Sequence, residues 1–198
     1  MSVKYHNFGG VIGWNLQKYF PNLSSDSYLK LQRSTRNKLQ QEYIDYFLST
    51  EEPPMPLVVN LETINRCNST CSFCTANKNA EKRPYKRMED SLFYSIIDQL
   101  ADWGYTGHLT LYGNNEPFLD TRIVEFHKYC REKLPHSFIF LSSNGLLLTV
   151  DKVKEIIPYV NQLIINNYCR DMKLHDNVKE IYEYAKSHPE EFKDVELL

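Results

Sequence analysis

The chain has 198 residues, a formal net charge of −2 and a sequence pI of about 6.3. This length allows one domain with a substantial core, and the balanced charge excludes an overall basic field that would hold a nucleic-acid backbone. Because the sequence has no apolar run long enough to span a bilayer and no signal pattern, we expect a cytoplasmic protein with no nucleic-acid or membrane partner.

Residues 1–55 are predicted to form an amino-terminal helical extension that ends in a proline-rich linker. The stretch Tyr28–Leu48 contains neither Gly nor Pro and follows a serine-rich group that can cap a helix. The prolines at 53, 54 and 56 then break any helix and deliver the chain to the next element. We therefore assign the core domain to residues 56–198.

From residue 57 onward, short apolar strands alternate with amphipathic helices. The predicted strands are Leu57–Thr63, His108–Tyr112, Ser137–Ser142, Gln162–Asn166 and Val195–Leu198. The predicted helices are Asp90–Trp103, Thr121–Leu134, one from Val150, and Asn177–Lys186. Their expected amino-terminal caps are Asp120, Thr149 and Asp176, and Gly104 is expected to end the first helix. The side chains placed inward on that first helix are Leu92, Phe93, Ile96, Ile97 and Leu100.

This order of elements predicts an α/β fold. Strand–helix–strand units with right-handed crossovers give a parallel sheet with helices outside it. Five strands would form a partial (β/α) TIM-like barrel rather than the closed eight-stranded one, and the chain is expected to be truncated after the fifth strand. The functional face should lie at the carboxyl ends of the strands, because polar segments follow four of them. These segments begin at Cys67, Gly113, Ser143 and Asn166.

Three cysteines follow the first predicted strand with the spacing C-x3-C-x2-C. They are Cys67, Cys71 and Cys74. Three thiolates on one loop can hold a corner of an iron–sulfur cube and leave its fourth iron without a protein ligand. An iron left open in this way is a site for chemistry.

The triad, with the aromatic Phe73 in its second gap, resembles the signature of the radical S-adenosylmethionine (radical SAM) enzymes. The resemblance covers about Pro56 to Leu198. The run Gly113-Asn114-Asn115-Glu116-Pro117 stands where that family usually has Gly-Gly-Glu-Pro, so the two Asn depart from the pattern and suggest a different backbone path or an added side-chain hydrogen bond. Asn144 belongs to an Asn-Gly turn that the family often has after its third strand.

By this resemblance the three cysteines would bind a [4Fe–4S] cluster whose open iron chelates SAM. Reductive cleavage of SAM would give a 5′-deoxyadenosyl radical that abstracts hydrogen from a substrate, with flavodoxin or ferredoxin as the one-electron reductant. The resemblance puts Phe73 beside the adenine, and Asn144 and Asn166 on the ribose or the methionine carboxylate. The methionine ammonium would meet the turn made of Gly113, Asn114, Asn115 and Glu116.

The substrate is not readable from these motifs, and peptides, sugars and small metabolites all stay open. The pattern is nearest to family members that carry a carboxyl-terminal, cysteine-rich SPASM-like extension, which this sequence does not contain. Cys130 reads as a small buried residue, whereas Cys169, three residues past Asn166, could serve chemistry or be an ordinary loop cysteine.

Two non-catalytic interpretations also remain. The chain could be a truncated domain that binds the cluster and cofactor without catalysis, or a zinc-stabilised interaction module. Structural zinc takes four closed ligands, so His108 or a later cysteine would have to complete the triad. His108 is predicted at the start of its strand, away from the cysteines.

Overall fold

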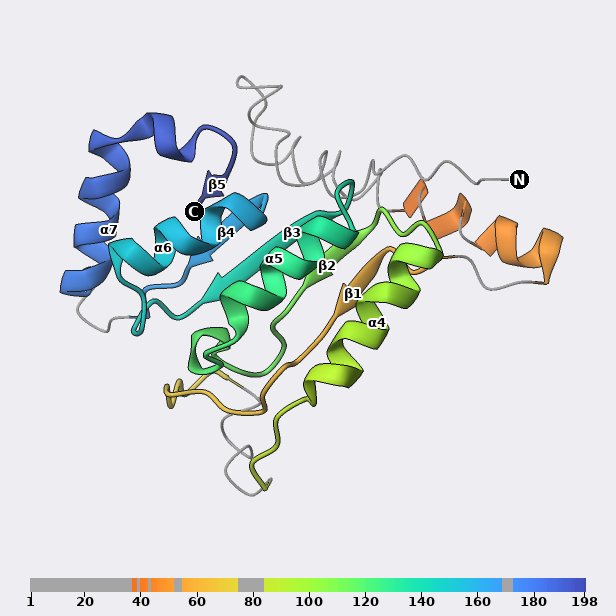
Figure 1. Cartoon of the computed structure of the whole chain (residues 1–198), viewed down its shortest axis with the longest axis horizontal. Coiled ribbons are helices and arrows are strands. Elements are labelled where there is room, and N and C mark those ends of the chain that lie inside the picture. Colours follow the sequence, from red (N-terminus) through yellow and green to blue (C-terminus); the bar gives the residue numbers. More distant parts are fainter. Residues whose placement is uncertain (1–36, 39, 43, 52–54, 75–83, 169–172) are drawn as a thin grey trace. The chain divides into compact units, whose positions relative to one another are not determined.

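The computed structural model describes residues 37–38, 40–42, 44–51, 55–74, 84–168 and 173–198 (Figure 1). The chain divides into two compact units, Met1–Leu57 and Val58–Leu198. In the first unit, residues 37–38, 40–42 and 44–50 are helical, two residues beyond the predicted end at Leu48. The earlier part of that predicted helix lies outside the described residues. The division into an extension and a core domain stays a prediction.

The second unit is built on a five-stranded parallel sheet. Its strands are β1 (Val58–Asn60), β2 (His108–Thr110), β3 (Phe138–Ser143), β4 (Gln162–Ile165) and β5 (Glu196–Leu197). They lie in the order β1-β2-β3-β4-β5, so each strand pairs with its neighbour in the sequence and the sheet is not closed. The prediction of an α/β partial barrel with parallel strands is confirmed.

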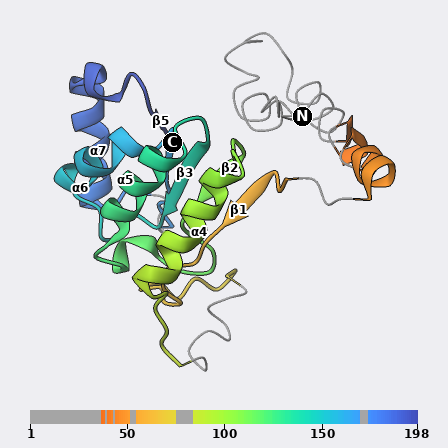
Figure 2. The same cartoon turned by 45° about the vertical axis from the view of Figure 1, so that its right-hand side comes forward.

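Helices follow the strands in alternation, as the sequence pattern predicts. They are α4 (Asp90–Asp102), α5 (Ile123–Lys133), α6 (Val150–Ile156) and α7 (Asp176–Ser187). Three short 3-10 turns, η1 (Pro117–Leu119), η2 (Ile157–Tyr159) and η3 (Pro189–Phe192), complete the connections. Helices α4, α5 and α6 cover one face of the sheet, and α7 lies beside α6 (Figures 1 and 2). Among the described residues, no helix is long and apolar enough to cross a bilayer.

The core lies between the helices and the sheet. Phe93 of α4 stacks on Phe126 of α5 with ring centroids 3.8 Å apart, and both side chains are fully buried. Ile139 and Leu141 of β3 are also fully buried, while the alternate positions of that strand are partly exposed. Each such side chain contributes about 2 kcal/mol through apolar area removed from water. This alternation fixes which face of the sheet carries the helices.

One predicted core position of α4 is wrong. Leu92 is 52% exposed, whereas Phe93, Ile97 and Leu100 are buried. The helical period of 3.6 residues leaves Leu92 at the edge of the apolar stripe, next to solvent.

Two predicted helix caps are wrong as well. α5 begins at Ile123, and Asp120 instead accepts hydrogen bonds from the backbone and side chain of Arg122. α7 begins at Asp176 itself, after His175, with no side-chain cap. The other two end signals are confirmed: Thr149 accepts from the backbone of Lys152 at 3.3 Å, and Gly104 ends α4 with φ of 67°.

Candidate active site

The segments that follow β1, β2, β3 and β4 gather at one end of the sheet (Figure 1). Parallel strands bring their carboxyl ends to the same edge, so residues far apart in the sequence become neighbours there. The Glu116 amide donates to the Arg66 carbonyl at 2.8 Å, next to the first cysteine. The Asn144 side chain, from the end of β3, reaches Asn68 in the same loop at 2.7 Å.

The three cysteines lie on one partly exposed loop after β1. The Cys74 amide donates to the Cys71 carbonyl at 3.1 Å, which turns the loop back on itself. Cys67 Sγ accepts hydrogen bonds from the Ser69 amide at 3.5 Å and from Asn144 Nδ2 at 3.7 Å. Two N–H donors therefore point at one sulfur of the loop.

The other two cysteines affect the pKa of the Cys71 thiol. Its pKa is raised, first by burial and then by the charges of Cys67 and Cys74. Bound iron would reverse this trend, because a coordinating thiol is deprotonated outright. The described residues contain no group of three His, Cys, Asp or Glu side chains arranged around a single metal ion. The cysteine-only donor set suits iron–sulfur ligation, in which each thiolate binds a different iron.

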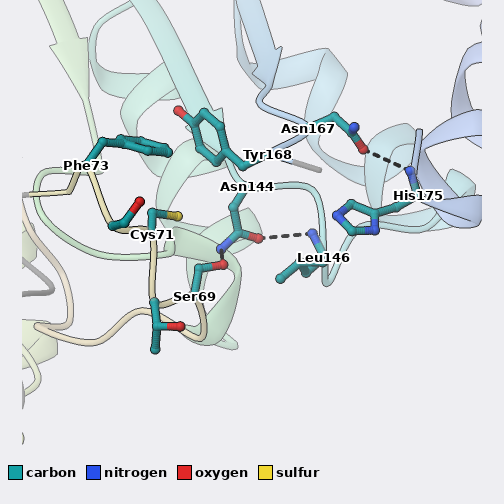
Figure 3. Close-up of a pocket in the computed structure, with 10 residues that line it drawn as sticks. Ser69, Cys71, Phe73, Asn144, Leu146, Asn167, Tyr168 and His175 are labelled. Atoms are coloured by element: carbon teal, nitrogen blue, oxygen red, sulfur yellow. Dashed lines mark hydrogen bonds between the residues drawn. The ribbon is translucent and has the colours of Figure 1, made fainter. Parts of the chain in front are cut away.

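A pocket of about 530 Å³ opens beside the cysteine loop (Figure 3). It is lined by Ser69, Thr70, Cys71, Ser72, Phe73, Asn144, Leu146, Asn167, Tyr168 and His175. The Cys71 side chain points toward Asn144, and Phe73 faces Tyr168 across the opening (Figure 3). The Phe73 and Tyr168 rings meet edge to face with centroids 4.9 Å apart, although Phe73 is 64% exposed. An exposed aromatic pair at a pocket mouth can receive a flat ligand group.

The turn Gly113–Glu116 after β2 is held by side-chain hydrogen bonds. Asn115 Oδ1 accepts from the Gly113 amide at 2.9 Å, and Glu62 accepts from the Asn114 amide at 3.0 Å. Asn115 Nδ2 is buried and has no partner among the described residues. The second Asn of this turn therefore supplies an added hydrogen bond, one of the two consequences that the sequence suggests for the departure from Gly-Gly.

Glu116 lies deeper than the rest of its turn. It is 1% exposed, and its carboxylate accepts from the Phe118 amide at 3.1 Å, the Ser143 hydroxyl at 2.9 Å and the Asn144 amide at 2.7 Å. Burial raises the pKa of this carboxyl, and the three hydrogen bonds, together with the charge of Lys152, partly offset the effect. Three protein donors thus compensate for the burial of this carboxylate.

Asn166 follows β4 and turns its side chain toward β3. Its amide nitrogen donates to the Ser142 hydroxyl at 2.7 Å, and its backbone amide donates to the Ser143 carbonyl at 2.8 Å. Of the predicted site residues, Cys71, Phe73 and Asn144 line the pocket. Glu116 and Cys67 are not among the lining residues, but both hydrogen-bond to Asn144.

The pocket also contains Asn167, next to Asn166 in the polar segment predicted after the fourth strand, and side chains that the sequence does not single out. Among the latter are Leu146, Tyr168 and His175. Asn167 accepts from the His175 amide at 2.9 Å and donates to the Lys173 carbonyl at 2.8 Å, so it fixes where α7 begins. Their position just past β3 and β4 was a usable signal, because chain segments at those strand ends must reach the same rim.

The remaining cysteines differ in what can be said of them. Cys130 is fully buried in α5, as the sequence predicts, and burial raises the pKa of its thiol. Cys169 lies outside the described residues, so its role stays open.

The chain is similar to proteins of one superfamily. A family model described as the radical SAM superfamily matches residues 61–189. The S-adenosyl-L-methionine-dependent 2-deoxy-scyllo-inosamine dehydrogenase of Niallia circulans is 22% identical over 99 residues, which is 50% of this chain and 39% of that protein. The present chain thus spans about two fifths of this curated relative.

Solved structures show the same fold. BtrN in complex with AdoMet and 2-DOIA superposes with a TM-score of 0.63 at 18% identity, covering 73% of this chain and 57% of BtrN. Native anSMEcpe with bound AdoMet gives a TM-score of 0.51 at 18% identity, covering 72% of this chain and 42% of that one. At these identities the likeness is one of fold.

Proposed function

Because this chain belongs to the radical SAM superfamily, whose members use a [4Fe–4S] cluster and SAM, we propose that it is a SAM-cleaving enzyme. Its cluster ligands would be Cys67, Cys71 and Cys74. The bound cluster would pass one electron to the sulfonium of SAM, giving methionine and a 5′-deoxyadenosyl radical that takes a hydrogen atom from the substrate. The observation that carries this proposal is the cysteine loop beside a pocket at the carboxyl ends of parallel strands.

The proposed SAM contacts follow from the side chains around the loop. Phe73, paired with Tyr168 at the pocket mouth, would receive the adenine against its exposed ring. The backbone carbonyls of Gly113–Asn115 would accept from the methionine ammonium. Asn166 would bond to the ribose hydroxyls by leaving or sharing its hydrogen bond with Ser142.

The substrate and the reductant are proposed only by class. The substrate would be a peptide, a sugar or a small metabolite, and the curated relative's name as a 2-deoxy-scyllo-inosamine dehydrogenase supports the last of these. Flavodoxin or ferredoxin would deliver the electron. We place the reaction in the reducing cytoplasm, where free thiols persist as metal ligands.

Anaerobic reconstitution with iron and sulfide tests the proposal. We expect about four irons and four sulfides per chain, the broad absorption of a [4Fe–4S] cluster, and formation of 5′-deoxyadenosine when dithionite and SAM are added. Cys71→Ala should lose both the cluster and SAM cleavage. Cys130→Ala, which changes a buried cysteine remote from the loop, should retain both.

Two results would count against the enzyme. Uptake of one zinc per chain without a cluster would favour a zinc-stabilised interaction module. A reconstituted cluster that yields no 5′-deoxyadenosine with SAM would favour a non-catalytic cluster-binding domain.

A further inference from the structure

The Asn144 side chain makes hydrogen bonds directly to the cysteine loop. Its Nδ2 lies 2.7 Å from Asn68 Oδ1, 3.1 Å from Ser69 Oγ and 3.7 Å from Cys67 Sγ. Its Oδ1 accepts from the Leu146 amide at 3.0 Å, and the two Asn144 bonds to Ser69 and Leu146 are drawn in Figure 3. Because a backbone amide can only donate, this last bond fixes the amide with its two hydrogens toward the loop.

Glu116 holds Asn144 from the other side. Glu116 Oε2 accepts a hydrogen bond from the backbone amide of Asn144, while Oε1 accepts one from the Ser143 hydroxyl. The Glu116 amide donates to the carbonyl of Arg66, the residue before the first cysteine. A single buried residue after β2 therefore ties the turn after β3 to the start of the cysteine loop. Burying a carboxylate is unfavourable unless its hydrogen bonds are satisfied, and here the partners belong to two of the segments that form the site.

We propose that Glu116 and Asn144 form a positioning clamp that sets the shape of the cysteine loop. Through its side-chain amide, Asn144 would also set the reduction potential of the cluster. This inference rests on the proposed function, because it takes Cys67 as a cluster ligand. The direct contacts with SAM that the sequence predicts for these two side chains stay a prediction beside it. Glu116 acts through Asn144, and Asn144 acts on the sulfur of Cys67.

The direction of the effect on the potential follows from charge. Reduction adds an electron to the cluster, and an N–H donor on a ligand sulfur stabilises the more negative state. The Asn144 amide therefore makes the cluster easier to reduce. Removing the donor should shift the potential to more negative values.

The first experiment is a reductive titration of the reconstituted full chain without SAM, followed by EPR. Asn144→Asp is nearly isosteric and keeps an oxygen for the Leu146 amide but has no N–H donor. Its potential should move to a more negative value than that of the parent protein. Asn166→Asp is the matched control, because it adds the same charge at the same rim while the native amide bonds to Ser142. Equal shifts in the two variants, or no shift in Asn144→Asp, would overturn the effect on the potential.

The second experiment needs no cluster. Glu116→Gln replaces an acceptor-only carboxylate by an amide, so one of the three donors loses its partner. Hydrogen exchange measured by mass spectrometry on the apoprotein should rise in residues 67–74 and 143–146. Glu125→Gln on the surface of α5, which bonds to Tyr94, should leave both segments unchanged. Unchanged exchange in residues 67–74, or a rise spread equally over the whole sheet, would overturn the clamp.

The two experiments separate this inference from the function on which it rests. If the parent protein takes up no cluster, the proposed function fails, and the exchange experiment still decides whether the clamp exists. If the cluster forms and cleaves SAM while the Asn144→Asp potential stays at the parent value, the function stands and the role of Asn144 in setting the potential is wrong.

Discussion

The β carbon that Gly145 lacks would lie 2.9 Å from Cγ2 of Ile165 and 2.9 Å from Cγ2 of Val178. Gly145 also has φ of 77°, a conformation that strains any L side chain. Both facts require glycine after Asn144, where the chain turns from β3 toward α6. We expect Gly145→Ala to lower the free energy of unfolding by about 2–4 kcal/mol, from left-handed strain and overpacking together. Urea denaturation followed by circular dichroism measures this loss.

Gly104→Ala is the matched control for this prediction. Gly104 has a similar φ of 67°, but a β carbon there would have no neighbour within 4 Å. Only the backbone strain then applies, and we expect a loss of about 1 kcal/mol. An equal loss of unfolding free energy in the two variants would show that the contact with Ile165 and Val178 adds no cost to Gly145→Ala.

Arg122, just before α5, forms a nearly buried ion pair with Asp120 and links this segment to the start of α4. Its guanidinium lies 2.7 Å from Asp120 Oδ2 and also contacts Asp90 at the start of α4, and it donates to the Met88 carbonyl at 2.9 Å. Burial alone would raise the pKa of Asp120, but the hydrogen bonds from Arg122 outweigh it and lower that pKa. Arg122→Ala would leave the Asp120 carboxylate buried without its partner, and we expect a loss of about 3 kcal/mol in unfolding free energy.

Lys133→Ala provides the comparison for Arg122→Ala. Lys133 pairs with Asp98 at 2.9 Å, but both side chains are nearly half exposed, so solvent screens the attraction. The loss in the same urea experiment should be much smaller than for Arg122→Ala. A comparable loss from both variants would mean that burial does not strengthen the Arg122 pair.

The strands and the cysteine loop could be predicted because their signals are local. Val58–Asn60, Phe138–Ser143 and Gln162–Ile165 are short apolar runs between turn residues, and each lies within one residue of its predicted range or inside it. The parallel order follows from the helices between them. Cys67 lies in the loop after β1 and Asn144 directly follows β3, so the parallel topology brings both to one rim.

Other features depend on contacts that no local pattern contains. Asp176 has the composition of a cap, yet α7 begins one residue earlier than predicted because Asn167 bonds to the His175 amide from across the loop. The burial of Glu116 is equally hidden, since its partners Ser143 and Asn144 follow it by about 27 residues. Such positions require the fold to be known before the side chain can be assigned a role.

The exposed ring of Phe73 should govern affinity for SAM. We expect Phe73→Ala to weaken SAM binding to the reconstituted protein about fivefold or more, because a ring–ring contact contributes roughly 1 kcal/mol beyond its buried area. Iron content should not change, since the side chain is not a ligand. Isothermal titration calorimetry under anaerobic conditions measures the affinity.

Trp103→Ala is the control for the loss of an exposed aromatic. Trp103 is 60% exposed and directly follows the last residue of α4, at the start of the segment that leads into β2. SAM affinity should stay at the parent value in this variant. An unchanged affinity in Phe73→Ala would remove Phe73 from the proposed SAM contacts.

His127 should make the fold sensitive to acid. It is fully buried in α5, with Nδ1 bonded to the Ile123 carbonyl at 2.7 Å. Burial, with a smaller effect from the charge of Arg131, lowers its pKa from 6.5 to about 4, despite the opposing hydrogen bond. Because the unfolded chain then binds a proton more readily than the folded one, the stability from neutral His127 is present above pH 6.5. It is lost as the pH falls toward 4.

The expected loss from this one group is about 3 kcal/mol across that range, since one pH unit corresponds to about 1.4 kcal/mol. Unfolding free energies of the parent protein and His127→Gln, measured in urea at several pH values between 7 and 4.5, test the prediction. The variant should start less stable at pH 7 and lose less on acidification. Contributions from Asp120 and Glu116 are common to both proteins and cancel in the difference. Parallel curves over the whole range would show that His127 is not held neutral by its burial.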